Sequence, residues 1–173
     1  MENSNNISTL HQLLDYNTQH FIVGEVHLQK SLHHWIEKSS AIKLKGIFQK
    51  YLEHIDHNIK AFEKFIDAEK LNLISNENKI LSIYVNDAEA KLELCTDVEI
   101  KDASILASVQ AINHYKICMY GTAAAYANTL GMDEAAKIFK MAEINEKQID
   151  DRLSQLAEFE INKRATSPIV LKN

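Results

Sequence analysis

Residues 102–156 decide the fold of this chain: DASILASVQAINHYKICMYGTAAAYANTLGMDEAAKIFKMAEINEKQIDDRLSQL. On both sides of Gly131 apolar residues recur every three or four positions, which is typical of a helix with one buried face. Gly131 is a natural helix C-cap and Asp133 a natural N-cap, so a tight break separates the two runs. We therefore expect two long antiparallel helices, the second reaching about residue 163.

Each of these two helices carries one polar residue in the middle of its apolar stripe. Asn113 lies in a stripe with Leu106, Val109, Ile117, Tyr120, Ala124 and Ala127. Glu146 lies in a stripe with Ala135, Phe139, Ala142, Ile149, Leu153 and Leu156. Both residues are expected within about one helical turn of the same height, counted from the Gly131 break.

The first half of the chain predicts a second pair of helices. A capping box at Thr9 and Gln12 begins one that runs to about Lys38, with Glu25 on its apolar face. The dipeptide 39–40, Ser-Ser, supplies a break and an N-cap for a helix to about residue 68, in which His54 lies beside the apolar stripe. Glu25 and His54 are equally far from this break and are therefore expected to meet.

Residues 69–99 read as a connection long enough to cross the bundle. The stretch ILSIYVNDAEAKLEL predicts one short helix, and Thr96 to Glu99 form a second capping box that opens the next long helix. The fold class is therefore all-α, an up-down four-helix bundle whose long crossover contains a short fifth helix. We expect residues 1–165 to form one domain and residues 166–173 a C-terminal tail.

The composition argues against two classes of partner, nucleic acids and membranes. The chain has 173 residues with 4 Gly, 1 Pro and a formal charge of −5, and acidic and basic residues are interspersed. Because this pattern gives no basic face, nucleic-acid binding is not expected. No run approaches 18 apolar residues and the N-terminus lacks the pattern of a signal peptide, so a cytoplasmic protein without a membrane partner is expected.

Burying two carboxylates requires a cation, a proton or neighbouring donors. One possibility is a weakly held ion on Glu25, His54 and Glu146, with Asp150 one turn along, a donor set suited to iron, manganese or zinc. Another is that Glu25 pairs with a lysine or a tyrosine hydroxyl. Two inward carboxylates are too few for a di-iron or di-manganese centre. The sequence contains no phosphate-binding glycine loop, no GxSxG and no HExxH.

Nearly the whole chain resembles the ferritin-like stress-protein family of unknown function typified by bacterial YciE and YciF. The family's Glu-His-Tyr-Glu-x-x-x-Tyr-Gly pattern stands here as residues 113–121, NHYKICMYG, and its Glu-Glu-Lys-x-x-Asp pattern as residues 145–150, NEKQID. Its second-helix pattern looks like residues 51–58, YLEHIDHN, and its first-helix Glu matches Glu25. The resemblance implies a dimer-forming ferritin-like bundle with a rubrerythrin-like di-metal site as the ancestral design.

The departures from the family bear on function. His54, Asn113 and Asn145 stand where the family has acidic residues, so the resemblance implies that di-iron chemistry is lost or weakened. Asn58 and Asn113 could instead donate to the remaining carboxylates.

Two hypotheses follow. The favoured one is a bacterial, stress-associated and non-enzymatic ferritin-like protein that acts by forming a homodimer or by binding a protein partner. The alternative is an iron or manganese metalloprotein with oxidase or peroxide-related activity at a remodelled mono- or di-metal site. The Asn residues favour the first, while the retention of Glu25 and Glu146 favours the second.

Overall fold

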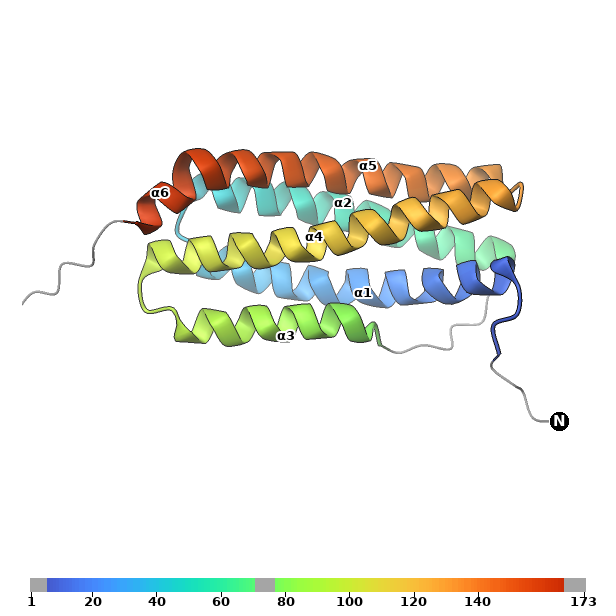
Figure 1. Cartoon of the computed structure of the whole chain (residues 1–173), viewed down its shortest axis with the longest axis horizontal. Coiled ribbons are helices and arrows are strands. Elements are labelled where there is room, and N and C mark those ends of the chain that lie inside the picture. Colours follow the sequence, from blue (N-terminus) through green and yellow to red (C-terminus); the bar gives the residue numbers. More distant parts are fainter. Residues whose placement is uncertain (1–5, 71–76, 167–173) are drawn as a thin grey trace, which may run out of the picture.

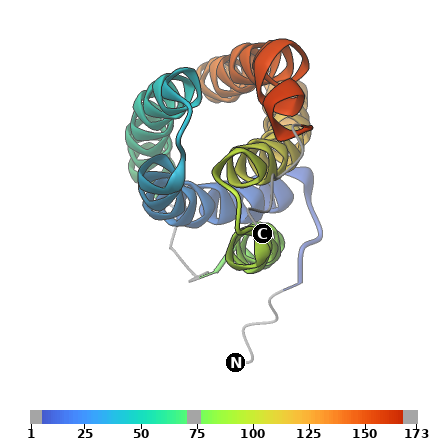
Figure 2. The same cartoon turned by 90° about the vertical axis from the view of Figure 1, so that its left-hand side faces the viewer.

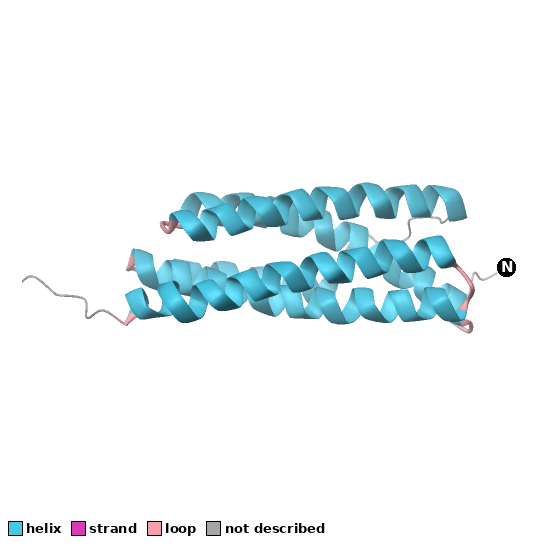
Figure 3. Ribbon diagram, turned by 90° about the horizontal axis from the view of Figure 1, so that it is seen from above, coloured by secondary structure: helices cyan, strands magenta, loops and turns pink. Residues whose placement is uncertain are grey.

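The computed structural model describes residues 6–70 and 77–166. These residues form helices and loops, with no strand among them (Figure 3). The elements in chain order are α1 (Leu10–Lys38), α2 (Ile42–Glu69), α3 (Lys79–Leu94), α4 (Val98–Thr129), α5 (Asp133–Leu156), a π-helical turn η1 (Ala157–Ile161) and α6 (Asn162–Ala165). In the described part of the chain, no helix is both long and apolar enough to cross a membrane.

Helices α1, α2, α4 and α5 form the four corners of a bundle, and α3 lies outside it (Figure 2). Each corner helix packs against two antiparallel neighbours, while α3 packs on α4 and α1 (Figure 1). Because α3 carries the chain back along the bundle, α2 and α4 run in the same direction. The all-α bundle with a short helix in its crossover is thus confirmed.

Local signals explain most helix boundaries. Thr9 accepts a hydrogen bond from the Gln12 backbone and the Gln12 side chain accepts one from the Thr9 backbone, which confirms the predicted capping box. Gly131 adopts φ +70°, the left-handed backbone that glycine favours, so the chain reverses there as expected. Asp97 rather than Thr96 caps α4, and Asp133 is the first residue of α5 rather than its N-cap.

The predicted serine N-cap of α2 is wrong. Ser39 and Ser40 lie in the link between α1 and α2, and the N-cap residue Ala41 has no side chain able to accept a hydrogen bond. The buried carboxylate of Asp102 on α4 instead binds the link that leads into α2. It accepts from the backbone of Ser40 (2.8 Å), the hydroxyl of Ser40 (2.5 Å) and the backbone of Ala41 (2.9 Å). A long-range contact therefore fixes the two residues that lead into α2, while the N-cap residue itself makes no side-chain hydrogen bond to the helix.

The apolar core has two parts. One cluster fills the end of the bundle around Trp35, Phe48 and Leu153, and the other fills the opposite end around Phe21, Phe62 and Phe139. Between the two apolar clusters, each corner helix contributes buried polar or charged residues. They are Glu25, Asn58, Asn113, Lys116 and Glu146. A polar layer at mid-height therefore separates the two apolar clusters.

The predicted tail lies, apart from Thr166, outside the described residues, as does part of the predicted connection, residues 71–76. The boundary between a domain of residues 1–165 and a tail of residues 166–173 stays a prediction.

Candidate functional site: a buried lysine between two glutamates

The polar layer is built around the ammonium group of Lys116, which α4 places inside the bundle. Its Nζ lies 2.8 Å from Glu25 Oε2 on α1 and 2.7 Å from Glu146 Oε1 on α5. The three side chains are at most 4% exposed. Lys116 also donates to the hydroxyl of Tyr51 at 3.1 Å, so three oxygens from three helices surround the ammonium. The ammonium neutralises one of the two buried charges.

The remaining carboxylate oxygens accept hydrogen bonds from neutral donors. Glu25 Oε1 accepts from the amide of Asn58 (2.9 Å) and the hydroxyl of Tyr120 (2.5 Å). Glu146 Oε2 accepts from the hydroxyl of Tyr51 (2.6 Å) and the amide of Asn113 (2.7 Å). The predictions that Asn58 and Asn113 donate to the retained carboxylates, and that Glu25 pairs with a lysine or a tyrosine, are confirmed.

The same contacts shift the pKa values of the network. Burial alone would lower the pKa of Lys116, but the facing carboxylates of Glu146 and Glu25 hold that pKa above its ordinary value. Burial raises the pKa of Glu146 to about 7; Lys116 opposes this rise and Glu25 adds to it. Burial and the neighbouring carboxylates also raise the pKa values of Tyr51 and Tyr120. The lysine therefore stays charged and the tyrosines stay neutral, acting as donors.

Lys116 is the central residue that the sequence reasoning missed. The apolar stripe assigned to its helix contained Ile117, which is only half-buried in the structure, whereas Lys116 is buried. Lys116 lies three residues after Asn113 and four before Tyr120, so helical spacing could have revealed it. It also stands at the second Glu of the family pattern quoted above.

The four predicted metal ligands do not come together. Glu25 and Glu146 face the same ammonium, but His54 is half-buried and bonds to the backbone of Asn145 on α5. Burial lowers the pKa of His54, and Lys50 and Arg152 lower it further. Asp150 pairs with His114 at 3.1 Å. The residue of α2 that meets Glu25 is Asn58 rather than His54.

The side chains present do not fit a di-metal centre. Within residues 6–70 and 77–166, no three His, Cys, Asp or Glu side chains gather in a way that could hold a metal ion. Lys116 occupies the space between the two carboxylates, and an ammonium repels a cation. The cavity that touches Glu25 and Lys116 measures about 10 Å³, which is room for about one water molecule.

Comparison with known proteins agrees with the fold. A family described as "Domain of unknown function (DUF892)" matches residues 9–166. The sequence is 31% identical to protein YciF of Escherichia coli (strain K12) over 144 residues, which are 82% of this chain and 86% of YciF. The crystal structure of the E. coli stress protein YciF matches with a TM-score of 0.84 and 26% identity, over 91% of this chain and 99% of that one. The resemblance inferred from the sequence is confirmed.

Two further structures share the fold. YcfI from Rhodopseudomonas palustris matches with a TM-score of 0.83 and 24% identity, over 87% of this chain and 96% of that one. A two-domain protein from Anabaena variabilis with DJ-1/ThiJ/PfpI-like and ferritin-like domains matches with a TM-score of 0.58 and 19% identity, over 96% of this chain and 40% of that one.

We expect Lys116→Met to destabilise the protein strongly, because it leaves two buried carboxylates without a cation. Loss of one partner of a buried ion pair costs about 3–5 kcal/mol of unfolding free energy. Urea denaturation measures this loss. Combining Lys116→Met with Glu25→Gln and Glu146→Gln should recover most of it.

The exposed Lys137, which pairs with Glu134 at 2.6 Å, provides the matched control. Lys137→Met should leave the unfolding free energy almost unchanged, because an exposed ion pair contributes little to stability. If Lys116→Met were as mild as Lys137→Met, the ammonium would not be what stabilises the polar layer.

The raised pKa of Glu146 predicts a pH dependence. From its ordinary value of 4.5 up to about 7, the folded state holds the Glu146 proton more tightly than the unfolded state. The stability that Glu146 contributes is therefore highest near the low end of this window and is lost as the pH rises through about 7.

Measured against Glu146→Gln, the wild type should lose up to about 3 kcal/mol of unfolding free energy between pH 4.5 and pH 7.5. Urea unfolding of both proteins across this range gives the difference in their unfolding free energies. The other carboxylates titrate in both proteins, so their contribution cancels in this difference. A difference that stays constant, or that grows in favour of the wild type with rising pH, would contradict the assignment.

Proposed function

The chain belongs to the DUF892 family, and on that premise we propose that it is a non-catalytic ferritin-like protein in which a lysine ammonium replaces the metal ions. The observation that carries the proposal is the position of Lys116 Nζ, within 2.8 Å of both Glu25 and Glu146. The oxidation chemistry of a di-metal bundle needs a metal with an open coordination position. Here the amides of Asn58 and Asn113 and the hydroxyls of Tyr51 and Tyr120 take up the remaining carboxylate oxygens.

We further propose that the protein acts through contacts with other protein chains, first of all as a homodimer. Large apolar side chains stay exposed along α3 and its junction with α4, and they are Ile80, Ile83, Leu94 and Val98. Helix α3 lies outside the four-helix bundle, so its outer face is available to a partner (Figure 2). The likeness to the E. coli stress protein YciF supports a role in a stress response.

Metal analysis tests the first proposal. Protein purified without chelator from cells supplied with iron and manganese should contain well below one metal ion per chain by plasma mass spectrometry. Glu146→Ala should leave this content unchanged. The double variant Asn113→Glu/Lys116→Glu, which restores both acidic positions of the family pattern and removes the ammonium, should bind more metal than the wild type.

A near-stoichiometric metal content in the wild type that disappears in Glu146→Ala would overturn the proposal. It would favour the alternative, a metalloprotein with oxidase or peroxide-related activity.

Sedimentation tests the second proposal. We expect the wild type to be a dimer and Ile83→Glu to weaken that dimer by roughly tenfold or more, because a charge placed in an apolar contact loses its hydration. The matched control is Ile42→Glu. Ile42 is 86% exposed and is the first residue of α2, whereas α3 packs on α4 and α1, so its variant should remain dimeric. A monomeric wild type would refute the homodimer.

A further inference from the structure

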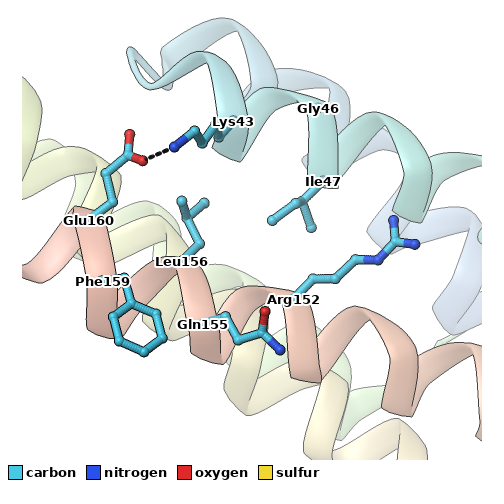
Figure 4. Close-up of a pocket in the computed structure, with 8 residues that line it drawn as sticks. All are labelled: Lys43, Gly46, Ile47, Arg152, Gln155, Leu156, Phe159 and Glu160. Atoms are coloured by element: carbon cyan, nitrogen blue, oxygen red, sulfur yellow. Dashed lines mark hydrogen bonds and ion pairs between the residues drawn. The ribbon is translucent and has the colours of Figure 1, made fainter.

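A groove opens between the start of α2 and the end of α5, and none of its lining residues belongs to the polar layer. Its volume is about 580 Å³, within the range of about 300–1,000 Å³ that is typical of small-molecule sites. Figure 4 shows Ile47 and Leu156 pointing into the groove from opposite walls. The floor of the groove is therefore apolar.

Both walls of the groove depart from a regular side-chain-covered α-helix. On the α2 wall Gly46 lies inside the helix, and a side chain added there would meet no other group within 4 Å. Glycine in a helix interior lowers stability relative to alanine, so helix formation does not favour it at this position. The other wall ends in the π-helical turn η1, a rare element that often lies at functional sites. The groove thus combines open space with an unusual backbone.

The rim of the groove carries one cation without a counter-ion. Lys43 and Glu160 pair at one end, at 2.5 Å, and Arg152 lies at the other end (Figure 4). Within residues 6–70 and 77–166, Arg152 forms no hydrogen bond or ion pair. Burial lowers the pKa of the nearby His54, and the charges of Lys50 and Arg152 lower it further, so the local field is positive. A guanidinium presents two parallel N–H groups that fit a carboxylate.

We propose that the groove binds a free medium-chain carboxylic acid, with its carboxylate on Arg152 and its alkyl chain between Ile47 and Leu156. This site goes beyond the proposed function and does not depend on it. Eight residues separate Arg152 from Glu160, which gives the groove a length of about 12 Å. An extended alkyl chain of about ten carbons spans that length.

The far end of the groove selects against a second acidic group. Glu160 is held there by Lys43 at 2.5 Å and by Arg164 at 2.9 Å, so its charge is already balanced. A second carboxylate on the ligand would face Glu160 and lose its hydration without gaining a free cation. The exposed ring of Phe159 instead offers an apolar contact to the end of an alkyl chain. A monocarboxylate therefore suits the groove better than a dicarboxylate.

Methyl NMR of the full chain tests the site with decanoate as the probe. Decanoate should shift the methyl signals of Ile47 and Leu156 saturably, with a Kd below about 1 mM, and leave that of Ile83 on α3 unchanged. Decanedioate and decyltrimethylammonium, which have the same chain length, should each bind roughly tenfold more weakly. Comparing the three probes separates recognition of one carboxylate from general binding of an alkyl chain.

Substitutions assign the two parts of the site, with the Leu156 methyl signals as the readout. Arg152→Gln should weaken decanoate binding roughly tenfold and remove the preference over decyltrimethylammonium. The matched control is Lys45→Gln, which removes one positive charge from α2 at a residue that does not line the groove and should leave the Kd unchanged. Gly46→Leu should fill the groove and abolish binding, while the chain stays folded because leucine favours a helix.

Three results would overturn the proposal. The first is the absence of a saturable shift at Ile47 and Leu156 in the wild type. The second is equal binding of the three probes, and the third is an equal effect of Arg152→Gln and Lys45→Gln on the Kd of decanoate.

Discussion

The structure depends on keeping charge balanced inside the bundle. Two carboxylates and one ammonium lie in a layer with almost no access to water, at N–O distances of 2.7 and 2.8 Å. A buried carboxylate is stable only when a cation, a proton or several donors replace the water it has lost. Lys116 supplies the cation, and two tyrosines and two asparagines supply the donors. One of the two carboxylates is still without a cation of its own, and the pKa of Glu146 is raised.

The polar layer also fixes the positions of the four helices relative to one another along the bundle axis. Apolar packing at each end of the bundle is non-directional, whereas an ammonium needs acceptors at defined positions. Lys116 on α4 finds them on α1, α2 and α5, so each corner helix contributes to the network. The second long-range restraint is Asp102, which ties the link between α1 and α2 to α4. Polar contacts of α4 therefore fix the arrangement that the apolar clusters stabilise.

The sequence predicted what depends on local or periodic signals. The capping box at Thr9, the reversal at Gly131 and the inward Glu25 and Glu146 follow from spacing alone, and the structure contains them. The sequence did not predict that Asp102 binds the link before α2, because that contact joins residues about 60 positions apart. The inward position of Lys116 was missed because hydrophobicity favours Ile117 at the neighbouring position. Helical spacing from Asn113 and Tyr120, together with the need to neutralise two glutamates, could have pointed to the lysine.

The same charge balance explains why the number of buried acidic residues has to match the charge of the buried cation. Two divalent ions carry four positive charges and need several carboxylates, whereas one ammonium carries a single charge and suits two. With Lys116 in place, a glutamate at position 113 would add a third buried negative charge to a site that already holds a net negative charge. Asn113 avoids this charge and donates to Glu146 at 2.7 Å. The asparagine and the lysine therefore form one consistent set, which supports the proposal that the ammonium stands in place of metal ions.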